Sequence, residues 1–407
     1  MRRPAGVLPG VLGWLEENLR WFDPEVWERH LPRRPFPPGP LLELLGFLRL
    51  LTREQGPAAV PQGLREGALD LAERITGTPE FATGLRRADA LFSYHLNVVA
   101  LLGLLGRPRP DLLKTCEALL ASGAGGHFQP HRPLLSRLEL RYFADRAALT
   151  LPAGIPDRAS LYAGSVPALE PDPLSLDDDE VYAFTHAVFY ATDFGADDVP
   201  PGGPLRDTVR VLLASHLIGG HLDLLAELLL CADLTGLGET DLARRSWAAL
   251  ASARRPDGAV PGPVHRPAVL SGLTGEKAEA YLFGTCYHTT LATGLAAVVR
   301  LGRGGTPEPD PPEEAWPPAT PPPYPPTGAP AEEVRAWAES IARAAPHAPQ
   351  PHRQVWAQAV TGALTLAARH RDPVTLAALL TASGPLGARN TPLARAAAAR
   401  LAAGWCS

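Results

Sequence analysis

Apolar residues recur at helical spacing through almost the whole chain, and this periodicity constrains the fold more than any other feature. Segments 41–56, 88–106 and 276–302 each carry apolar residues three and four positions apart over several turns. Most of these segments end at a glycine, which terminates helices because it readily adopts left-handed backbone angles. Period-2 alternation is short wherever it occurs, for example at 138–142. The sequence therefore predicts an all-α fold of antiparallel helix pairs.

Charge and composition exclude several classes of protein. The chain has 407 residues, is 45% hydrophobic and has a formal net charge of −5. No basic patch dominates, so nucleic acid and anionic membranes are not expected partners. Two arginines and an apolar stretch open the chain, but Glu16, Glu17 and Arg20 interrupt the stretch. We expect an amphipathic first helix, no membrane span and a cytoplasmic protein with too few cysteines for a disulfide framework.

A proline-rich segment at 303–330 marks the clearest boundary in the sequence. Proline cannot continue a helix, so this segment is expected to be extended. It predicts a helical main body at 1–302 and a tail of amphipathic helices at 331–407. The segment and the tail together could bind a protein partner.

Two glycine-containing turns resemble those of a known superfamily. Residues 125–129 lie within SGAGGHFQP, and residues 257–260 lie within RRPDGAVPG. Both resemble the turns of α/α-toroid proteins, which include protein prenyltransferase β subunits, terpene cyclases and lanthipeptide cyclases. The resemblance implies that the helix pairs close into an α/α toroid, with an open α-solenoid as the alternative. Three loop histidines, His127, His131 and His265, are expected to be exposed and without a role.

A third segment extends the resemblance. Residues 284–289, GTCYHT, are similar to the segment of prenyltransferase β subunits that holds a zinc-binding histidine. The Cys-His-Gly motif of lanthipeptide cyclases and the acidic motif of terpene cyclases are absent. The chain also resembles an uncharacterised actinobacterial family, which supplies no activity to carry over.

Cys286 and His288, with Cys231 and Asp233, form the candidate zinc site. Zinc binds thiolate, imidazole and carboxylate groups, and a catalytic zinc keeps one position open. Both pairs are two residues apart, a spacing that separates side chains on a helix. The pair at 286 and 288 can therefore meet only at a helix terminus. The alternative is that both cysteines are small buried apolar residues.

His186, Tyr190 and Asp193 form the candidate catalytic group. Steps of three and four residues place them on one helical face, where the carboxylate could orient the imidazole or accept a proton. The alternative is an aromatic core stripe with Asp193 at the end of the helix. In a toroid, His95 would be a neighbour of this group, whereas His216 and His221 are interpreted as structural.

Two functions follow from these candidates. The first is a zinc-dependent enzyme that acts on a peptide or small natural-product intermediate in a central cavity. The alternative is a non-catalytic helical-repeat protein that binds partners as a scaffold. The sequence has no G-x-S-x-G, G-x-G-x-x-G or Walker motif, so a serine hydrolase and a nucleotide-dependent enzyme are not expected.

Overall fold

The computed structural model describes residues 6–127, 129, 131–198, 204–307, 316 and 320–404. In these residues the chain forms nineteen α-helices, five short 3-10 helices and no strand. The predicted all-α class is therefore confirmed. The alternating pattern at 138–142 lies within helix α8 (Leu134–Arg146). Closure into a toroid stays a prediction.

The chain divides into two compact units that are not continuous in sequence. Unit 1 contains residues 1–169, 184–201 and 253–307, and unit 2 contains 170–183, 202–252 and 308–407. The chain passes from unit 1 to unit 2 after Pro307, within the proline-rich segment. The C-terminal helices thus share a unit with residues that the sequence assigned to the main body.

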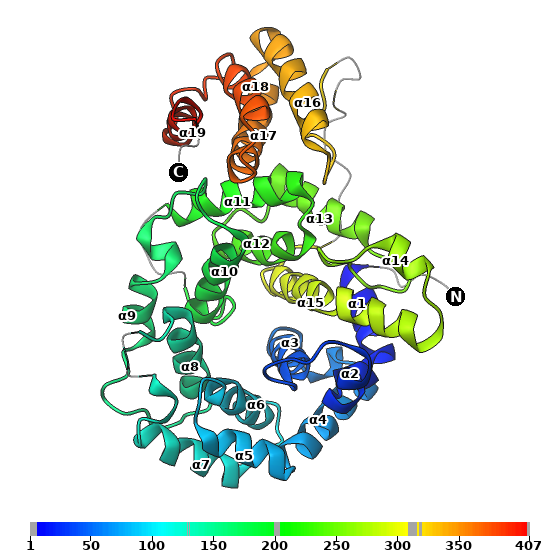
Figure 1. Ribbon diagram of the computed structural model, residues 1–407, viewed down its shortest axis with the longest axis vertical. Helices are drawn as coiled ribbons and strands as arrows, with labels where there is room; N and C mark the ends of the chain where they lie inside the picture. The colour runs from blue at the N-terminus through cyan, green and yellow to red at the C-terminus, as the bar shows by residue number, and fades with distance from the viewer. Residues whose placement is uncertain are drawn as a thin grey trace. The chain divides into compact units, whose positions relative to one another are not determined.

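Unit 1 contains eleven helices of the described chain, and α10 (Asp178–Thr192) begins in unit 2 and ends in unit 1. The eleven are α1 (Val7–Glu17), α2 (Pro24–His30), α3 (Gly39–Gln55), α4 (Gln62–Thr76), α5 (Pro79–Arg87), α6 (Phe92–Leu104), α7 (Pro110–Ala121), α8, α9 (Arg158–Ala163), α14 (Pro267–Ser271) and α15 (Gly275–Gly302). Helix α3 packs between α15 and α6, and α6 packs in turn against α8 (Figure 1). Helices α4, α5 and α7 pack against the other sides of α6.

An aromatic cluster fixes the first two helices of unit 1 against α15. Phe283 of α15 is fully buried and stacks on Trp14 of α1, with ring centroids 5.7 Å apart. Phe22 meets the same ring edge-on at 4.9 Å, and Trp27 of α2 does so at 5.9 Å. Such geometries add to the apolar area that large rings bury. This cluster holds the middle of α15 in place.

The turn that contains RRPDGAVPG follows α13 (Asp241–Ala253) and contacts both α1 and α15. Gly258 has φ of 102°, and a side chain there would meet the backbone oxygen of Gly10 at 2.2 Å. The amide of Val260 donates to Thr290 Oγ1, and the amide of Gly262 donates to the carbonyl of Thr285, both at 2.9 Å. Glycine is therefore required by backbone angle and by close approach.

Unit 2 contains seven helices of the described chain besides the start of α10. These are α11 (Leu205–Gly219), α12 (Leu222–Leu234), α13 (Asp241–Ala253), α16 (Ala331–Ala344), α17 (Gln350–Arg369), α18 (Pro373–Ser383) and α19 (Pro392–Ala402). Helices α11 and α12 form a hairpin in which Gly220 adopts φ of 71° and the side chain of His221 caps α12. Helix α17 crosses α11 closely, since a side chain at Gly362 would meet Ala214 Cβ at 2.6 Å.

Within unit 2, described residues of the proline-rich segment pack against α16 and α17. Trp337 Nε1 of α16 donates to the carbonyl of Pro322 at 2.9 Å. The ring of Trp316 lies 4.2 Å from His352 and 5.6 Å from Trp356, both on α17. No helix forms at 320–330, as the prolines predict.

One described helix, α15, is long and apolar enough to cross a membrane. In its most apolar window 72% of the residues are buried inside the protein. A core helix meets the same criteria, so length and composition alone are weak support for a membrane span.

Candidate functional site

Cys286 and His288 lie in the middle of α15 and contact different parts of unit 1. The Cys286 Sγ is buried and lies 3.8 Å from His265 Nδ1. The His288 Nδ1 lies 2.9 Å from Glu43 Oε2 of α3. The sequence required a helix terminus to bring the pair together, but α15 continues without a break through both positions. Residues two apart on a helix point away from each other, so the pair is not brought together.

The surroundings of the cysteines also disfavour thiolate chemistry. Burial raises the pKa of the Cys286 thiol to about 11, although Thr285 partly opposes the shift. Cys231 of α12 is fully buried in unit 2, and burial raises its pKa well above the ordinary value. Asp233 lies on the same helix and is 6% exposed. In the described part of the chain, no three His, Cys, Asp or Glu side chains form a group suited to a metal ion.

Asp193 lies just beyond the end of α10. The helix ends at Thr192, and Asp193 and Phe194 follow with φ of 46° and 51°. The predicted helical face shared with His186 is therefore wrong at this position. Left-handed angles at two non-glycine residues are uncommon and need strong local support.

Three arginines and a tyrosine provide that support. Arg49 Nη1 donates to Asp193 Oδ1 at 3.0 Å, and Tyr142 OH donates to the same oxygen at 2.6 Å. Arg53 and Arg146 lie 3.0 and 3.2 Å from the carboxylate oxygens. Burial raises the pKa of Asp193, but these donors outweigh it and leave the pKa below its ordinary value. The Asp193 carboxylate thus links the end of α10 to α3 and α8 through hydrogen bonds and ion pairs.

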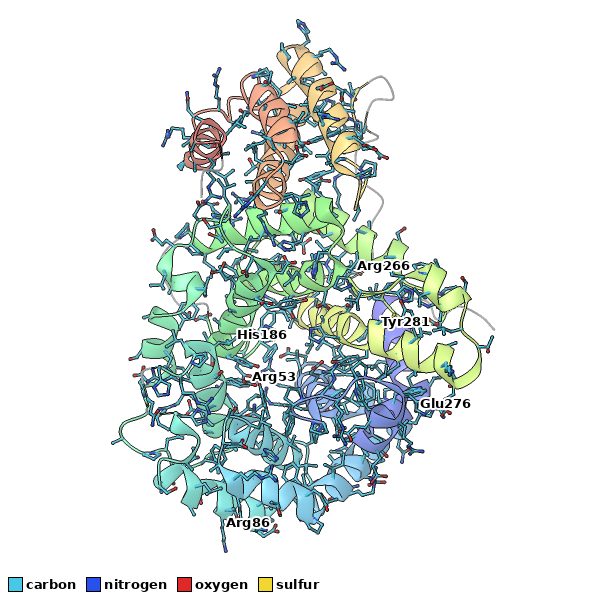
Figure 2. All side chains as sticks on the ribbon, in the orientation of Figure 1. Arg53, Arg86, His186, Arg266, Glu276 and Tyr281 are labelled. Atoms are coloured by element: carbon cyan, nitrogen blue, oxygen red, sulfur yellow. The ribbon has the colours of Figure 1, made fainter. Side chains whose placement is uncertain are left out.

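His186 and Tyr190 of α10 meet a residue that the sequence analysis missed, Glu139 of α8. Tyr190 OH donates to Glu139 Oε1 at 3.4 Å, and Asn97 Nδ2 of α6 donates to the same oxygen at 3.0 Å. The rings of His186 and Tyr190 lie 6.1 Å apart. Figure 2 labels His186 on α10 and Arg53 on α3. We call Asn97, Glu139, His186 and Tyr190 the Glu139 group.

The ionisation of the Glu139 group is strongly perturbed. Burial raises the pKa of Glu139 to about 7, even though the nearby His186 imidazole lowers it. Burial and the neighbouring Glu139 raise the pKa of Tyr190 well above its ordinary value. Tyr94 of α6 shows the same direction and the same two causes. Glu139, whose pKa is raised to about 7, thus lies beside Tyr190 and Tyr94, whose phenols remain protonated at neutral pH.

The sequence contained a signal for Glu139 that the sequence analysis did not use. In a helix, Glu139 lies four residues after Leu135 and four before Phe143, on the apolar face of α8. A carboxyl on such a face is costly unless it is paired or used. The residue is therefore recognisable once 134–146 is taken as helical.

The other histidines are distributed over separate places. His95 lies between Phe36 and Phe81 at ring distances of 5.0 and 4.9 Å. His127 and His265 are 1% and 8% exposed, so the expectation that these loop histidines are exposed is wrong. The loops pack inward at these points, and only His131 of the three is exposed.

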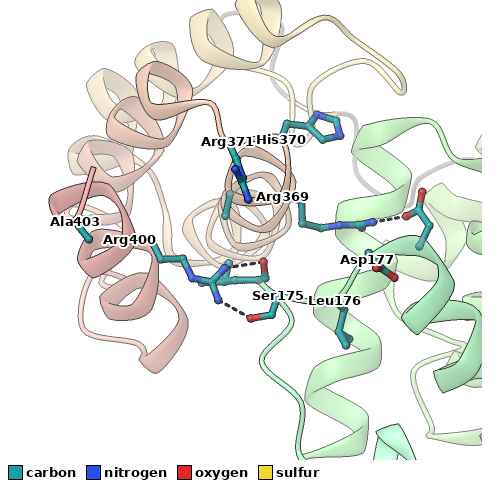
Figure 3. A pocket seen from close by; sticks show the side chains of 11 residues that line it. Ser175, Leu176, Asp177, Arg369, His370, Arg371, Arg400 and Ala403 are labelled. Carbon is teal, nitrogen blue, oxygen red and sulfur yellow. Dashed lines mark hydrogen bonds and ion pairs between the residues drawn. The ribbon is translucent and has the colours of Figure 1, made fainter. Parts of the chain in front are cut away.

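Unit 2 has a cavity of about 580 Å³ lined by the start of α10, the end of α17 and α19 (Figure 3). Arg369 donates to Asp178 at one wall, and Arg400 Nη1 donates to the carbonyl of Leu174 at 2.7 Å at another. His216 Nε2 and His221 Nε2 each lie 3.6 Å from an oxygen of Asp178. His216 and Arg369 hold the pKa of Asp178 well below its usual range, although burial opposes them. These contacts connect helices, which supports the structural interpretation of both histidines.

The fold and these contacts define an all-α protein built from helix pairs, with buried polar groups where the helices of each unit meet. The chain belongs to the family described as domain of unknown function DUF6895, which matches residues 8–298. The match includes the whole Glu139 group and excludes helices α16 to α19. None of the curated proteins and none of the solved structures matches the chain. Zinc, a peptide or small-molecule ligand and a cytoplasmic location stay predictions.

Proposed function

We propose that the chain is an enzyme in which Glu139 transfers protons, assisted by His186 and Tyr190. The substrate we propose is of the class expected from the sequence, a peptide or small natural-product intermediate. The observation that carries the proposal is the raised pKa of Glu139, about 7, at a point where three helices meet. A general acid or base is most effective when its pKa lies near the working pH.

Each member of the Glu139 group has a part in this proposal. The carboxyl exchanges the proton, because both of its forms are populated near neutral pH. Tyr190 keeps its proton and donates to the carboxylate that the transfer leaves behind. His186 favours the charged form of Glu139 and so keeps its pKa from rising further.

Asn97 offers a position for the substrate. Its amide nitrogen is held by Glu139, which fixes the orientation of the side chain. Its oxygen is buried and has no hydrogen-bond partner in the described residues. Buried polar atoms are nearly always paired, so an unpaired acceptor beside a titratable carboxyl suits a donor group of a ligand. Perturbed ionisation and an unsatisfied acceptor thus coincide in one place.

The predicted zinc is not part of this proposal. Cys286 contacts His265 and His288 contacts Glu43, so α15 directs the two expected ligands to different neighbours. The scaffold alternative has less support, because the described part of the proline-rich segment is packed against α16 and α17. Neither observation bears on proton transfer by Glu139.

Turnover by the purified chain tests the proposal. The protein is incubated at pH 7 with a small-molecule and peptide extract of its source cells, and mass spectrometry follows every component. We expect at least one component to be consumed by the unaltered chain and to persist with Glu139→Gln. Glutamine keeps the acceptor for Asn97 and Tyr190 but cannot exchange the proton.

Glu17→Gln is the matched control, since Glu17 ends α1 and is exposed. It should consume the same component at the unaltered rate. Consumption that is equal in all three proteins, or absent from all three, would contradict the proposed proton transfer.

A further inference from the structure

The cavity of about 580 Å³ lies wholly within unit 2, and none of its lining residues belongs to the Glu139 group. Its volume is in the range of pockets that hold one small molecule. The loop before α10, the end of α17 and the end of α19 line it. Its apolar surface comes from Leu174, Leu176, Ala368 and Ala403. The cavity can therefore hold the apolar part of a ligand.

Three arginines line the same space, Arg369, Arg371 and Arg400 (Figure 3). Two of them are matched by carboxylates. Arg369 donates to Asp178, and the Nη2 of Arg400 donates to an oxygen of Asp172 at 2.7 Å. Arg371 is exposed and has neither an ion pair nor a side-chain hydrogen bond with any residue that the structure describes. One guanidinium in the lining is thus free to pair with a ligand.

The turn between α17 and α18 holds Arg371 in a conformation that favours glycine. Arg371 has φ of 52°, in the left-handed region. The turn is fixed on both sides: the Arg371 amide donates to the carbonyl of Ala368 at 3.1 Å, and the side chain of Asp372 caps α18. An arginine thus stands where the backbone alone would favour glycine. Such a cost is typical of positions whose side chain has a function.

The start of α10 limits the charge that a ligand can carry. Asp177 lines the cavity and is exposed, and its Oδ1 accepts from the amide of Glu180 at 2.8 Å, which caps α10. No arginine in the described part of the chain pairs with Asp177. Its carboxylate would repel a second negative charge on a ligand, whereas a single carboxylate needs only Arg371. The lining therefore favours a monoanion over a dianion.

We propose that this cavity binds a small organic monocarboxylate, whose carboxylate pairs with Arg371 and whose apolar part lies against the leucine and alanine side chains. A guanidinium presents parallel N–H donors that match both oxygens of a carboxylate. The neutral amide of the same shape lacks the charge and replaces one acceptor with a donor, so it suits Arg371 less well. The site shares no residue with the Glu139 group, so it does not depend on the proposed catalysis.

The test compares four six-carbon ligands on the full-length chain by titration calorimetry at neutral pH. Hexanoate is the monoanion, hexanamide its neutral counterpart, adipate the dianion and hexylamine the cation. We expect hexanoate to bind at least fivefold more tightly than each of the others, and more weakly as salt is added. Arg371→Gln, which removes the charge, should reduce hexanoate binding at least fivefold.

Arg371→Gly separates a role in binding from a role in the fold. Glycine adopts the left-handed angles of this turn without cost, so this variant should unfold at the same or a higher temperature while its affinity for hexanoate falls at least fivefold. Arg389→Gln is the matched control, because Arg389 lies in the loop after α18, is exposed and has no ion pair in the described part of the chain. It should bind hexanoate as the unaltered chain does.

Several results would overturn the proposal. Among the ligands, these are no binding of hexanoate, equal binding of hexanoate and hexanamide, or tighter binding of adipate or hexylamine. Among the variants, they are undiminished binding to Arg371→Gln or Arg371→Gly, or an equal loss in Arg389→Gln. A lower unfolding temperature of Arg371→Gly would also overturn it, since the arginine would then serve the fold.

Discussion

At the scale of single residues, Asp193 shows how a buried charge can hold an unfavourable backbone. Its carboxylate is 1% exposed and is bonded by Arg49 and Tyr142. We expect Asp193→Asn to lower the free energy of unfolding by roughly 3–5 kcal/mol, because the arginine charge would remain buried without its partner. Urea unfolding followed by circular dichroism measures the change. The exposed Asp198→Asn should be neutral, and an equal small loss in both variants would contradict this role.

The candidate site could be predicted only in part. His186 and Tyr190 are in the group that the structure brings together, since both lie on one face of α10. Asp193 was placed on that face because periodicity alone does not reveal a left-handed residue that ends the helix. Glu139 comes from another helix, and its contacts with α6 and α10 depend on how the helices pack. Local spacing does not contain that information.

At the scale of helices, the contact of α11 with α17 depends on a missing side chain. A carbon on Gly362 would lie 2.6 Å from Ala214 Cβ and 2.9 Å from the Ser215 amide nitrogen. We expect Gly362→Val to lower the free energy of unfolding by roughly 1–3 kcal/mol, because the backbone atoms of α11 cannot move aside easily. Thermal unfolding measures it. Gly46→Val, at an open helical position, should not be destabilising, because valine has a higher helix propensity than glycine, and similar losses in both variants would contradict the account.

Helix positions were predictable because local spacing determines them. The predicted segment 276–302 corresponds to α15, and 41–56 corresponds to α3 within two residues at each end. The helix terminus that Cys286 and His288 would need in order to meet is absent, since Phe283 and its aromatic neighbours bury that part of α15. Glycine inside a helix is tolerated where packing demands it, and a side chain at Gly284 would meet Leu31 Cδ2 at 2.8 Å. Tertiary packing thus overrides a local signal.

At the scale of the whole molecule, Glu139 should make stability depend on pH. Its pKa is about 7 in the folded chain and about 4.5 without burial, so the folded state retains the proton between these values. The contribution of Glu139 to the free energy of unfolding should therefore fall by ~3 kcal/mol as pH rises from about 4.5 to above 7. Buried His127, whose pKa is lowered to about 4, contributes the opposite slope, so the Glu139 contribution is measured as the difference between the unaltered chain and Glu139→Gln. Asp178 and Asp193 have lowered pKa values and act in a different window, losing stability as pH falls below about 4. Chemical unfolding at each pH measures the stability change in both pH windows. Glu139→Gln should remove the Glu139 contribution between about pH 4.5 and 7.

The division of the chain into two units could not be predicted from the sequence, and the reason is physical. The chain crosses between units several times, and residues 170–183 and 202–252 join helices that follow residue 308. A proline-rich segment marks where the chain leaves a helix, but not which distant helices it then meets. The pairing of α17 with α11 rests on complementary surfaces rather than on proximity in sequence.

The most direct test of the central claim is the titration of the Glu139 carboxyl itself. Carbon-13 NMR of the chain labelled at the glutamate carboxyl carbon follows each resonance with pH, and Glu139→Gln identifies the one that belongs to residue 139. The account predicts a midpoint of about 7 for this carboxyl. A midpoint near 4.5, where an ordinary glutamate titrates, would contradict it.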